Sequence, residues 1–318
     1  MIKKNINIIL NTCAGIRQDD TVLILSDDKT AEIGKLFYNL SKMSIESVEH
    51  VIVESSNIPG ANEPTNEIAA SMLNKTLIIS LTSTSIAHTQ ARYNASKSGA
   101  RFLSLPDYSL KLLERDSLDT DYFSAKIKVD YFAKLLTRTN KVYVETDKGT
   151  SLELIVKDRD GNSCPCIVRN AGEIGSPPDI EANIAIVEDS TNGIFVVDGS
   201  IACSEFGLLE EIIILKIKNG RIVSFEGKNS EKLEHLFSHH SELAKVPAEL
   251  GFGFNEKANL CGIMLEDEGC LGTLHIGFGS NSTIGGKNKV PFHLDMIIKE
   301  PDVFFDNVKI LDKGKYNI

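Results

Sequence analysis

Two histidines and an aspartate near the C-terminus have the types and spacing of metal ligands. His275, His293 and Asp295 lie within residues 273–306. Neutral imidazole and carboxylate groups together suit Zn, Mn, Co or Fe(II). His293 and Asp295 form an H-x-D pair, and side chains two apart on an extended strand leave the same face. The Gly-, Ser- and Asn-rich segment 277–288 is typical of a folding-back loop, so we expect the three side chains to converge on one cavity.

Two acidic residues could complete a larger ligand set. Glu173 lies among Gly, Pro and Asn in RNAGEIGSPPDIEANIAI, and Glu249 lies in KVPAELGFGFNEKAN. Either carboxylate alone is more typical of a solvated loop. Together with the two histidines and Asp295 they would make five ligands, enough for two metal ions that share a bridging carboxylate or water.

A second pair of histidines competes for the metal. His235 and His239 are four residues apart in a helix that we expect over 229–244, so they share one helical face. The glutamate of the H-E-x-x-H motif is absent, because Leu236 follows the first histidine. Ser, Lys and Glu surround the pair, which favours a solvated helix face over a catalytic site.

Short apolar strands alternate with helices in the first half of the chain. This alternation is typical of βαβ units, which form a parallel sheet covered on both faces. We therefore predict a Rossmann-like α/β sandwich over residues 1–138. After an opening helix at 5–16, we expect strands at 21–27, 48–54, 76–81 and 100–105, and helices at 29–42, 66–74, 88–98, 107–116 and 119–138.

No nucleotide-binding motif accompanies this pattern. The turn after the first strand, SDDKTAE, lacks the G-x-G-x-x-G that lets a pyrophosphate approach the backbone. GFGFNE and GFGSNS have only two glycines at that spacing, and no G-x-x-x-x-G-K-[ST] motif is present. We therefore expect neither a dinucleotide cofactor nor ATP.

Turn signals dominate from about residue 140. Asn-Gly and Asp-Gly between alternating apolar runs are strong hairpin signals. They predict a mainly antiparallel, β-rich domain over residues 139–318, which would carry the metal ligands. The signals are Lys148-Gly149, Asp160-Gly161, Asp198-Gly199, Asn219-Gly220 and Asp306-Asn307.

Composition excludes several classes of partner. The net charge is −10 with acidic and basic residues interspersed, whereas phosphate binding needs clustered Lys and Arg, so nucleic acid is not expected. No segment resembles a transmembrane span or a secretion signal, so we expect a cytoplasmic protein with no membrane partner. The six cysteines are then reduced thiols. Cys164 and Cys166 could form half of a zinc site, but no second pair follows at finger spacing.

The motifs around the candidate ligands, in this order, resemble a known family. They are GE-x-x-x-P, a DGSI turn, A-E-L-G-F-G-x-N, H-I-G-F-G-S-N and H-L-D. They resemble the thermophilic-type metallo-aminopeptidases, the aminopeptidase T and aminopeptidase S group, clearly over about residues 140–310. The resemblance implies a two-domain, homodimeric exopeptidase. It also implies a dinuclear site held by Glu173, Glu249, His275, His293 and Asp295.

One position departs from that family. The peptidases have a catalytic tyrosine about seven residues after the histidine that corresponds to His275, and here Ser282 takes its place. The segment between His275 and His293 is also shorter. Both features bring the chain nearer to relatives that act on small molecules, including the iron-dependent dioxygenases that open dihydroxypyridine rings.

Three functional hypotheses follow. The first is an aminopeptidase-type hydrolase, in which two Zn, Co or Mn ions activate a water to cleave a peptide or amide bond. Glu249 or Glu173 would then move the proton. The second is a mononuclear Fe(II) ring-opening dioxygenase, with His275, His293 and Asp295 as a facial triad. The third is a small-molecule binder without activity. We take the hydrolase as the main prediction, with a small peptide or small molecule as substrate.

Overall fold

The computed structural model describes residues 1–54, 63–203 and 205–317. These residues form two compact units. The first contains Met1–Phe123 and Cys166–Pro178, and the second contains Ser124–Pro165 and Asp179–Ile318. No helix in the described ranges is long and apolar enough to cross a membrane.

The division falls earlier than the predicted boundary at residues 138 and 139, inside helix α6 (Tyr122–Arg138). Most of α6 belongs to the second unit because its apolar side packs there. The Phe132 ring lies 4.9 Å from the ring of Phe252 and 5.2 Å from that of Phe254. A helix pattern alone does not say which neighbouring sheet the helix covers.

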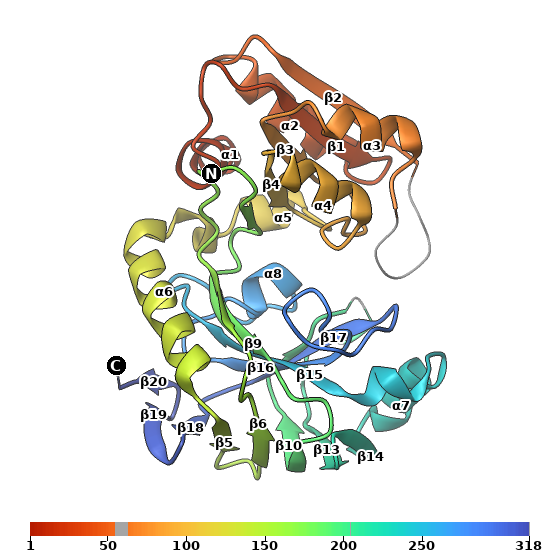
Figure 1. Cartoon of the computed structure of the whole chain (residues 1–318), viewed down its shortest axis with the longest axis vertical. Coiled ribbons are helices and arrows are strands. Elements are labelled where there is room, and N and C mark those ends of the chain that lie inside the picture. The colour runs from red at the N-terminus through yellow and green to blue at the C-terminus, as the bar shows by residue number, and fades with distance from the viewer. Residues whose placement is uncertain (55–62, 204, 318) are drawn as a thin grey trace. The chain divides into compact units, whose positions relative to one another are not determined.

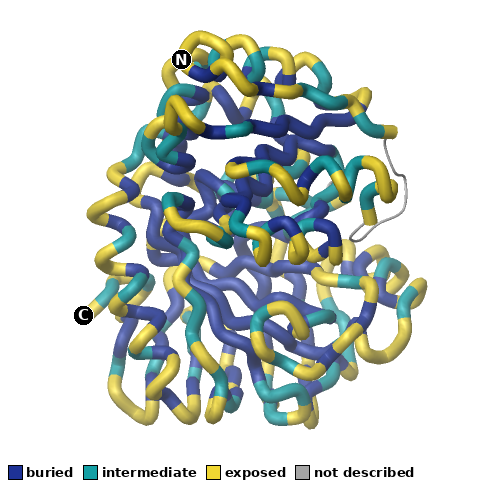
Figure 2. Tube along the Cα trace, turned by 45° about the horizontal axis from the view of Figure 1, so that its top comes forward, coloured by how far each residue is buried: buried dark blue, intermediate teal, exposed yellow. Residues whose placement is uncertain are grey.

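The first unit is built on a parallel sheet, as predicted. Its strand order is β2-β1-β3-β4-β8, and every pair in it is parallel. All residues of β1, β3 and β4 are buried, because helices cover both faces (Figures 1 and 2). The strands are β1 (Val22–Asp27), β2 (Val48–Val53), β3 (Leu77–Ser80), β4 (Arg101–Ser104) and β8 (Ile174–Gly175).

Most helices of this unit follow the predicted ranges, but the helix predicted at 107–116 is only four residues long and is followed by a 3-10 turn. Threonine caps set two of the starts: Thr65 accepts a hydrogen bond from Ile68 N, and Thr89 accepts one from Arg92 N. The opening helix begins earlier than predicted and continues as a π-helical turn. The elements are α1 (Ile2–Ile8), η1 (Ile9–Cys13), α2 (Ala31–Ser41), α3 (Asn66–Met72), α4 (Gln90–Lys97), α5 (Leu110–Leu113) and η2 (Asp116–Asp119).

The second unit contains two antiparallel sheets, again as predicted (Figure 1). One has the order β14-β13-β10-β6-β5-β18-β19-β20, with β5 (Lys141–Glu145), β6 (Ser151–Ile155), β10 (Asn192–Val197), β13 (Ile213–Lys218), β14 (Arg221–Gly227), β18 (Asp302–Phe305), β19 (Val308–Asp312) and β20 (Lys315–Tyr316). The other has the order β12-β11-β17-β16-β15-β9-β7, with β7 (Gly161–Cys164), β9 (Glu181–Ala185), β11 (Ser200–Ile201), β12 (Gly207–Leu208), β15 (Pro247–Gly253), β16 (Leu274–Gly279) and β17 (His293–Ile298).

The core of this unit lies between the two sheets. Phe278 of β16 lies 6.3 Å from Phe195 of β10, and Phe252 of β15 lies 5.8 Å from Phe305 of β18, measured between ring centroids. Side chains alternate along a strand. Glu249 and Phe252 are three positions apart on β15, and His275 and Phe278 are three positions apart on β16. The side chains of Glu249 and His275 therefore leave the opposite face of the second sheet from the phenylalanines.

Two of the predicted hairpin turns do not form hairpins, because the strands on either side of each turn pair in different sheets. Asn219-Gly220 and Asp306-Asn307 do form hairpins, with positive φ at both central residues. Asp198-Gly199 does not: β10 pairs in the first antiparallel sheet, and β11 pairs with β12 and β17 in the second. Here Gly199 N donates to Ile297 O instead. Asp160-Gly161 likewise leads from β6 into β7 of the other sheet.

The remaining elements of the second unit are short helices. Helix α7 (Ser230–Ser238) and the 3-10 turn η3 (Glu242–Lys245) occupy the range predicted as one helix at 229–244. Helix α8 (Met264–Asp267) precedes the strand that carries His275.

Candidate metal centre

Three neighbouring strands bring most of the predicted ligands to one face of a sheet. In the register, Glu249 of β15 lies opposite Gly277 of β16, and Gly277 lies opposite Asp295 of β17. His275 and His293 are each two residues from members of this row, so they share its face. This face is turned away from the core between the two sheets.

Glycines alternate with the functional side chains on this face. Gly251 lies opposite His275 in the register, and Gly279 lies opposite His293. A Cβ at Gly251 would overlap the His275 ring. A Cβ at Gly277 would lie 2.7 Å from Asp295 Oδ1 and 2.8 Å from His293 Nε2. The G-x-G spacings of β15 and β16 therefore make room for the imidazoles and carboxylates.

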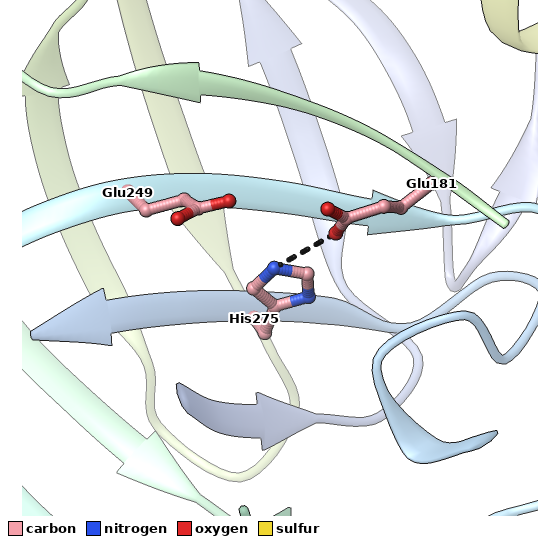
Figure 3. Close-up of side chains that lie close together, drawn as sticks. All are labelled: Glu181, Glu249 and His275. Carbon is pink, nitrogen blue, oxygen red and sulfur yellow. Dashed lines mark ion pairs between the residues drawn. The ribbon is translucent and has the colours of Figure 1, made fainter. Parts of the chain in front are cut away.

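The side chains form two overlapping groups with the geometry of metal ligands. In each group the ligand atoms lie within 4.8 Å of one another. One group is Glu181, Glu249 and His275, and the other is Glu249, His293 and Asp295. In Figure 3 the carboxylates of Glu181 and Glu249 point toward each other from neighbouring strands, above the His275 ring. Glu249 belongs to both groups and joins them.

The contacts within these groups leave polar atoms without full hydrogen bonding. His275 Nε2 lies 3.1 Å from Glu181 Oε2, and His293 Nε2 lies 3.3 Å from both Asp295 Oδ1 and Glu249 Oε2. Glu181 Oε2 and Asp295 Oδ1 are buried, yet neither contact has the alignment of a hydrogen bond. His275 Nδ1 is also buried without a partner among the described residues. Such atoms are rare in proteins unless an ion or water completes them.

The carboxylates attract positive charge to the histidines. Burial alone would lower the pKa of His275, but Glu181, Asp295 and Glu249 raise it to about 9. Burial opposes the same effect at His293, whose pKa is raised well above its ordinary value by Asp295 and Glu249. A proton on each ring would supply some of the positive charge that a divalent metal would supply. The donor set and its electrostatics therefore fit such an ion.

Two further buried acids increase the negative charge around the group. Burial, and then the charges of the neighbouring carboxylates, raises the pKa of Asp179 and of Glu268 well above the ordinary values. Glu268 directly follows α8, and its side chain is one of the groups that lower the pKa of Asp295. Asp295 itself keeps a lowered pKa: burial would raise it, but His293 and His275 more than compensate. Asp295 thus ionises more readily than Asp179, Glu249 or Glu268.

The orientation of His293 is fixed by the loop that follows β16. His293 Nδ1 lies 2.9 Å from Ser280 O, so the ring donates there and presents Nε2 to Glu249 and Asp295. About 36% of the His293 side chain is exposed, whereas 2% of the His275 side chain is. His293 therefore marks the side of the group that solvent reaches.

A buried amide holds this loop in place. Asn281 Nδ2 donates to Ala248 O at 3.1 Å and to Ile186 O at 3.3 Å, and Asn281 Oδ1 accepts from Asn288 N at 2.9 Å. Asn288 Nδ2 in turn donates to the carbonyl of Gly279. The ends of β9, β15 and β16 are thus tied to the loop that orients His293.

The carboxylate of Glu173 is held by its own loop, and its assignment as a ligand stays a prediction. It belongs to the first unit, where Oε2 accepts hydrogen bonds from Arg169 N and Asn170 N and Oε1 accepts one from Asn170 Nδ2. Its carboxylate therefore closes its own loop. Glu181 is the acid that contacts His275 instead. The signal for Glu181 was a polar pair, Glu181 and Asn183, at alternate positions of an otherwise apolar strand.

Comparison with known proteins gives related structures and a related sequence. The structure of 2,5-dihydroxypyridine dioxygenase from Pseudomonas putida KT2440 matches with a TM-score of 0.85 at 17% identity, over 99% of this chain and 96% of that one. AmpT from Thermus thermophilus matches with a TM-score of 0.70 at 12% identity, over 100% and 99%. These likenesses show a shared fold. In sequence, a 2,5-dihydroxypyridine 5,6-dioxygenase from P. putida KT2440 is 27% identical over 139 residues, 40% of each protein.

A family model decides between the hypotheses. The model described as 2,5-dihydroxypyridine 5,6-dioxygenase matches residues 6–317. The prediction of an aminopeptidase-type hydrolase was therefore wrong, although the structural link to AmpT was sound. The departure at Ser282 was the better guide, because it favoured the ring-opening relatives. The chain belongs to the 2,5-dihydroxypyridine 5,6-dioxygenase family.

Proposed function

We propose that this protein is an Fe(II)-dependent dioxygenase that opens a dihydroxylated pyridine ring. The family match over residues 6–317 supports the reaction class. The observation that carries the metal assignment is the group of imidazoles and carboxylates on one face of β15, β16 and β17. Two histidines and one carboxylate are the ligand set of non-haem Fe(II) oxygenases.

His275 from one group, and His293 and Asp295 from the other, would together hold the iron. The carboxylate of Asp295 stays ionised, and the two imidazoles contribute nitrogen ligands once they are neutral. Iron bound there would supply the redox chemistry that lets O2 react with an aromatic ring. Two Zn, Co or Mn ions were expected on the peptidase hypothesis, and a single iron replaces them.

The two glutamates would act on protons and orientation. Glu181 contacts His275 Nε2 and fixes the plane of that ring. Burial, opposed by His293, raises the pKa of Glu249. A carboxylate with a raised pKa is a better proton acceptor near neutral pH. Glu249 would therefore accept a proton from a ring hydroxyl of the substrate, on the side where His293 meets solvent.

The test is oxygen consumption by the iron-loaded protein. The chain would be loaded with Fe(II) under anaerobic conditions, and O2 uptake would be followed with 2,5-dihydroxypyridine. We expect one O2 consumed per ring opened, with both atoms of labelled O2 in the product. His293→Ala should lose the activity, and His50→Gln, which changes a histidine of the first unit, should keep it. Bound iron without O2 uptake on any dihydroxypyridine isomer would refute the proposal.

A further inference from the structure

A second pair of histidines lies on α7, outside the candidate metal centre. His235 and His239 are both exposed, and their Nε2 atoms are 3.1 Å apart. Their ring centroids are 4.5 Å apart, with the ring planes at 77°. The sequence pattern favoured a solvated helix face here. The structure adds that the two Nε2 atoms are the atoms of the two rings that meet.

This separation is close to that of two ligands on one metal ion. Imidazole nitrogens bind a tetrahedral ion at about 2.0–2.1 Å, which places two of them about 3.3 Å apart. The pair therefore already has nearly the nitrogen–nitrogen separation that chelation of one ion requires. In the absence of an ion, one ring donates a hydrogen bond to the other, which satisfies the same 3.1 Å distance.

The helix that carries the pair is firmly anchored. On its buried side the Phe237 ring packs 5.0 Å from Phe292 and 5.5 Å from Phe225. In its last turn, Ser238 Oγ donates to His235 O at 2.7 Å. A ligand on the exposed side would thus meet side chains whose backbone is already ordered, which lowers the entropic cost of binding.

We infer that His235 and His239 form a surface site for a divalent transition-metal ion that prefers imidazole, such as Cu²⁺, Ni²⁺ or Zn²⁺. Water molecules would complete the coordination, because no third His, Cys, Asp or Glu joins the pair in the part of the chain that the structure describes. The Irving–Williams order predicts that Cu²⁺ binds most tightly. The site does not depend on the proposed function, since it shares no residue with the candidate metal centre.

The site would affect how metal content is interpreted. A chain exposed to Zn²⁺ or Cu²⁺ would carry one ion on α7 in addition to any ion in the candidate metal centre. A count of two ions per chain would then not mean a dinuclear centre. Variants of the α7 pair separate the two sources.

The chain itself offers a matched control. His240 is the next residue after the pair, but its ring packs on Phe292 with 4.5 Å between centroids. His240→Ala therefore removes a neighbouring histidine without touching the pair. His235→Ala and His239→Ala each remove one proposed ligand from an exposed position, so both should fold normally.

The experiment is calorimetric titration of the Fe(II)-loaded protein with Ni²⁺ under anaerobic conditions. We expect the wild type and His240→Ala to bind one more Ni²⁺ per chain than His235→Ala or His239→Ala, or to bind it at least tenfold more tightly. Electron paramagnetic resonance of added Cu²⁺ should show two coordinating nitrogens in the wild type and one in either variant. Equal Ni²⁺ binding by all four proteins would leave only a hydrogen-bonded pair and overturn the inference.

Discussion

Buried carboxylates occur in both units, but their surroundings differ. Asp27 ends β1 of the parallel sheet, where Oδ2 accepts hydrogen bonds from Ser83 N and Oγ and Oδ1 accepts them from Lys29 N and Thr30 N. Burial would raise the pKa of Asp27, but these donors lower it. In the second unit, Glu181 and Asp295 keep buried oxygens without well-aligned donors.

The comparison separates two uses of a buried acid. An acid whose oxygens all meet donors is satisfied by the protein alone, and it stabilises the fold. Asp179 and Glu268 mainly face other acids, which raises the pKa of both, and such acids are satisfied only by a proton or a cation. The second arrangement therefore indicates a binding site, and the predictions below test that distinction.

The largest effect should come from filling the space between the ligands. In Gly277→Ala the new Cβ would lie 2.7 Å from Asp295 Oδ1 and 2.8 Å from His293 Nε2. We expect almost complete loss of bound iron, measured by elemental analysis after anaerobic loading. Gly99→Ala is the control: φ is +106° and the nearest atom to its Cβ is 3.9 Å away, so it strains the backbone without filling a site. Gly277→Ala with a full complement of iron would refute the ligand geometry.

Removing one carboxylate charge should weaken iron binding in the second unit but lower the stability of the fold in the first. Asp295→Asn should weaken iron binding by more than the 10–100-fold typical of an outer-shell change. Asp27→Asn should keep the iron but lose about 1–3 kcal/mol of unfolding free energy, because the amide presents donors to Ser83 and Thr30. Iron titration and denaturant unfolding of both variants would measure this. Equal loss of iron in both would end the distinction between the two environments.

Loosening the loop behind His293 should have a smaller effect. Asn281→Ala removes the donors to Ala248 O and Ile186 O, and with them the anchor of the loop whose Ser280 carbonyl orients His293. We expect iron affinity to fall by about 10–100-fold, the usual effect of an outer-shell partner. Ser282→Ala, an exposed neighbour, should leave the affinity unchanged. Unchanged affinity in Asn281→Ala would show that β17 alone fixes the ring.

The smallest effect should be on the pH dependence of the metal-free protein. The raised pKa of Glu268 means that the folded chain holds this proton more tightly than the unfolded chain. Its contribution is therefore complete below the unfolded pKa and is lost as pH rises. Glu268→Gln should reduce the loss of stability between about pH 5 and pH 8 by about 1 kcal/mol. Asp27 has a lowered pKa, so its contribution is lost in acid instead. Identical pH profiles for Glu268→Gln and the wild type would contradict this assignment.

Sequence patterns predicted most of the fold because burial left a clear trace in composition. The strands of the first unit are apolar throughout, since helices cover both faces. Strand β8 has only two residues and no such trace. The turn at Asp198-Gly199 was recognised, but a turn signal does not say which sheet the next strand will join.

The candidate site was predicted in part. Glu249, His275, His293 and Asp295 lie on one sheet face, and their role as ligands stays a prediction. Glu173 was proposed from its loop context and from the resemblance, and its role also stays a prediction. Glu181 was missed, because its contact with His275 depends on the pairing of β9 with β15, which no local pattern encodes. The predicted homodimer also stays a prediction, since it rested on resemblance alone.

The G-F-G triplets of β15 and β16 couple the site to the core. Glycine is a poor strand former, so the segments that carry Glu249 and His275 gain little stability from their own backbone. Phe252 and Phe278, each between two glycines, anchor these strands from the other face. The sheet is only one residue thick, so a packing defect around Phe278 on one face would disturb the ligands on the other face directly. Metal affinity would then depend on how well the core side chains pack. A substitution in this hydrophobic layer would lower the iron content, although the layer never touches iron.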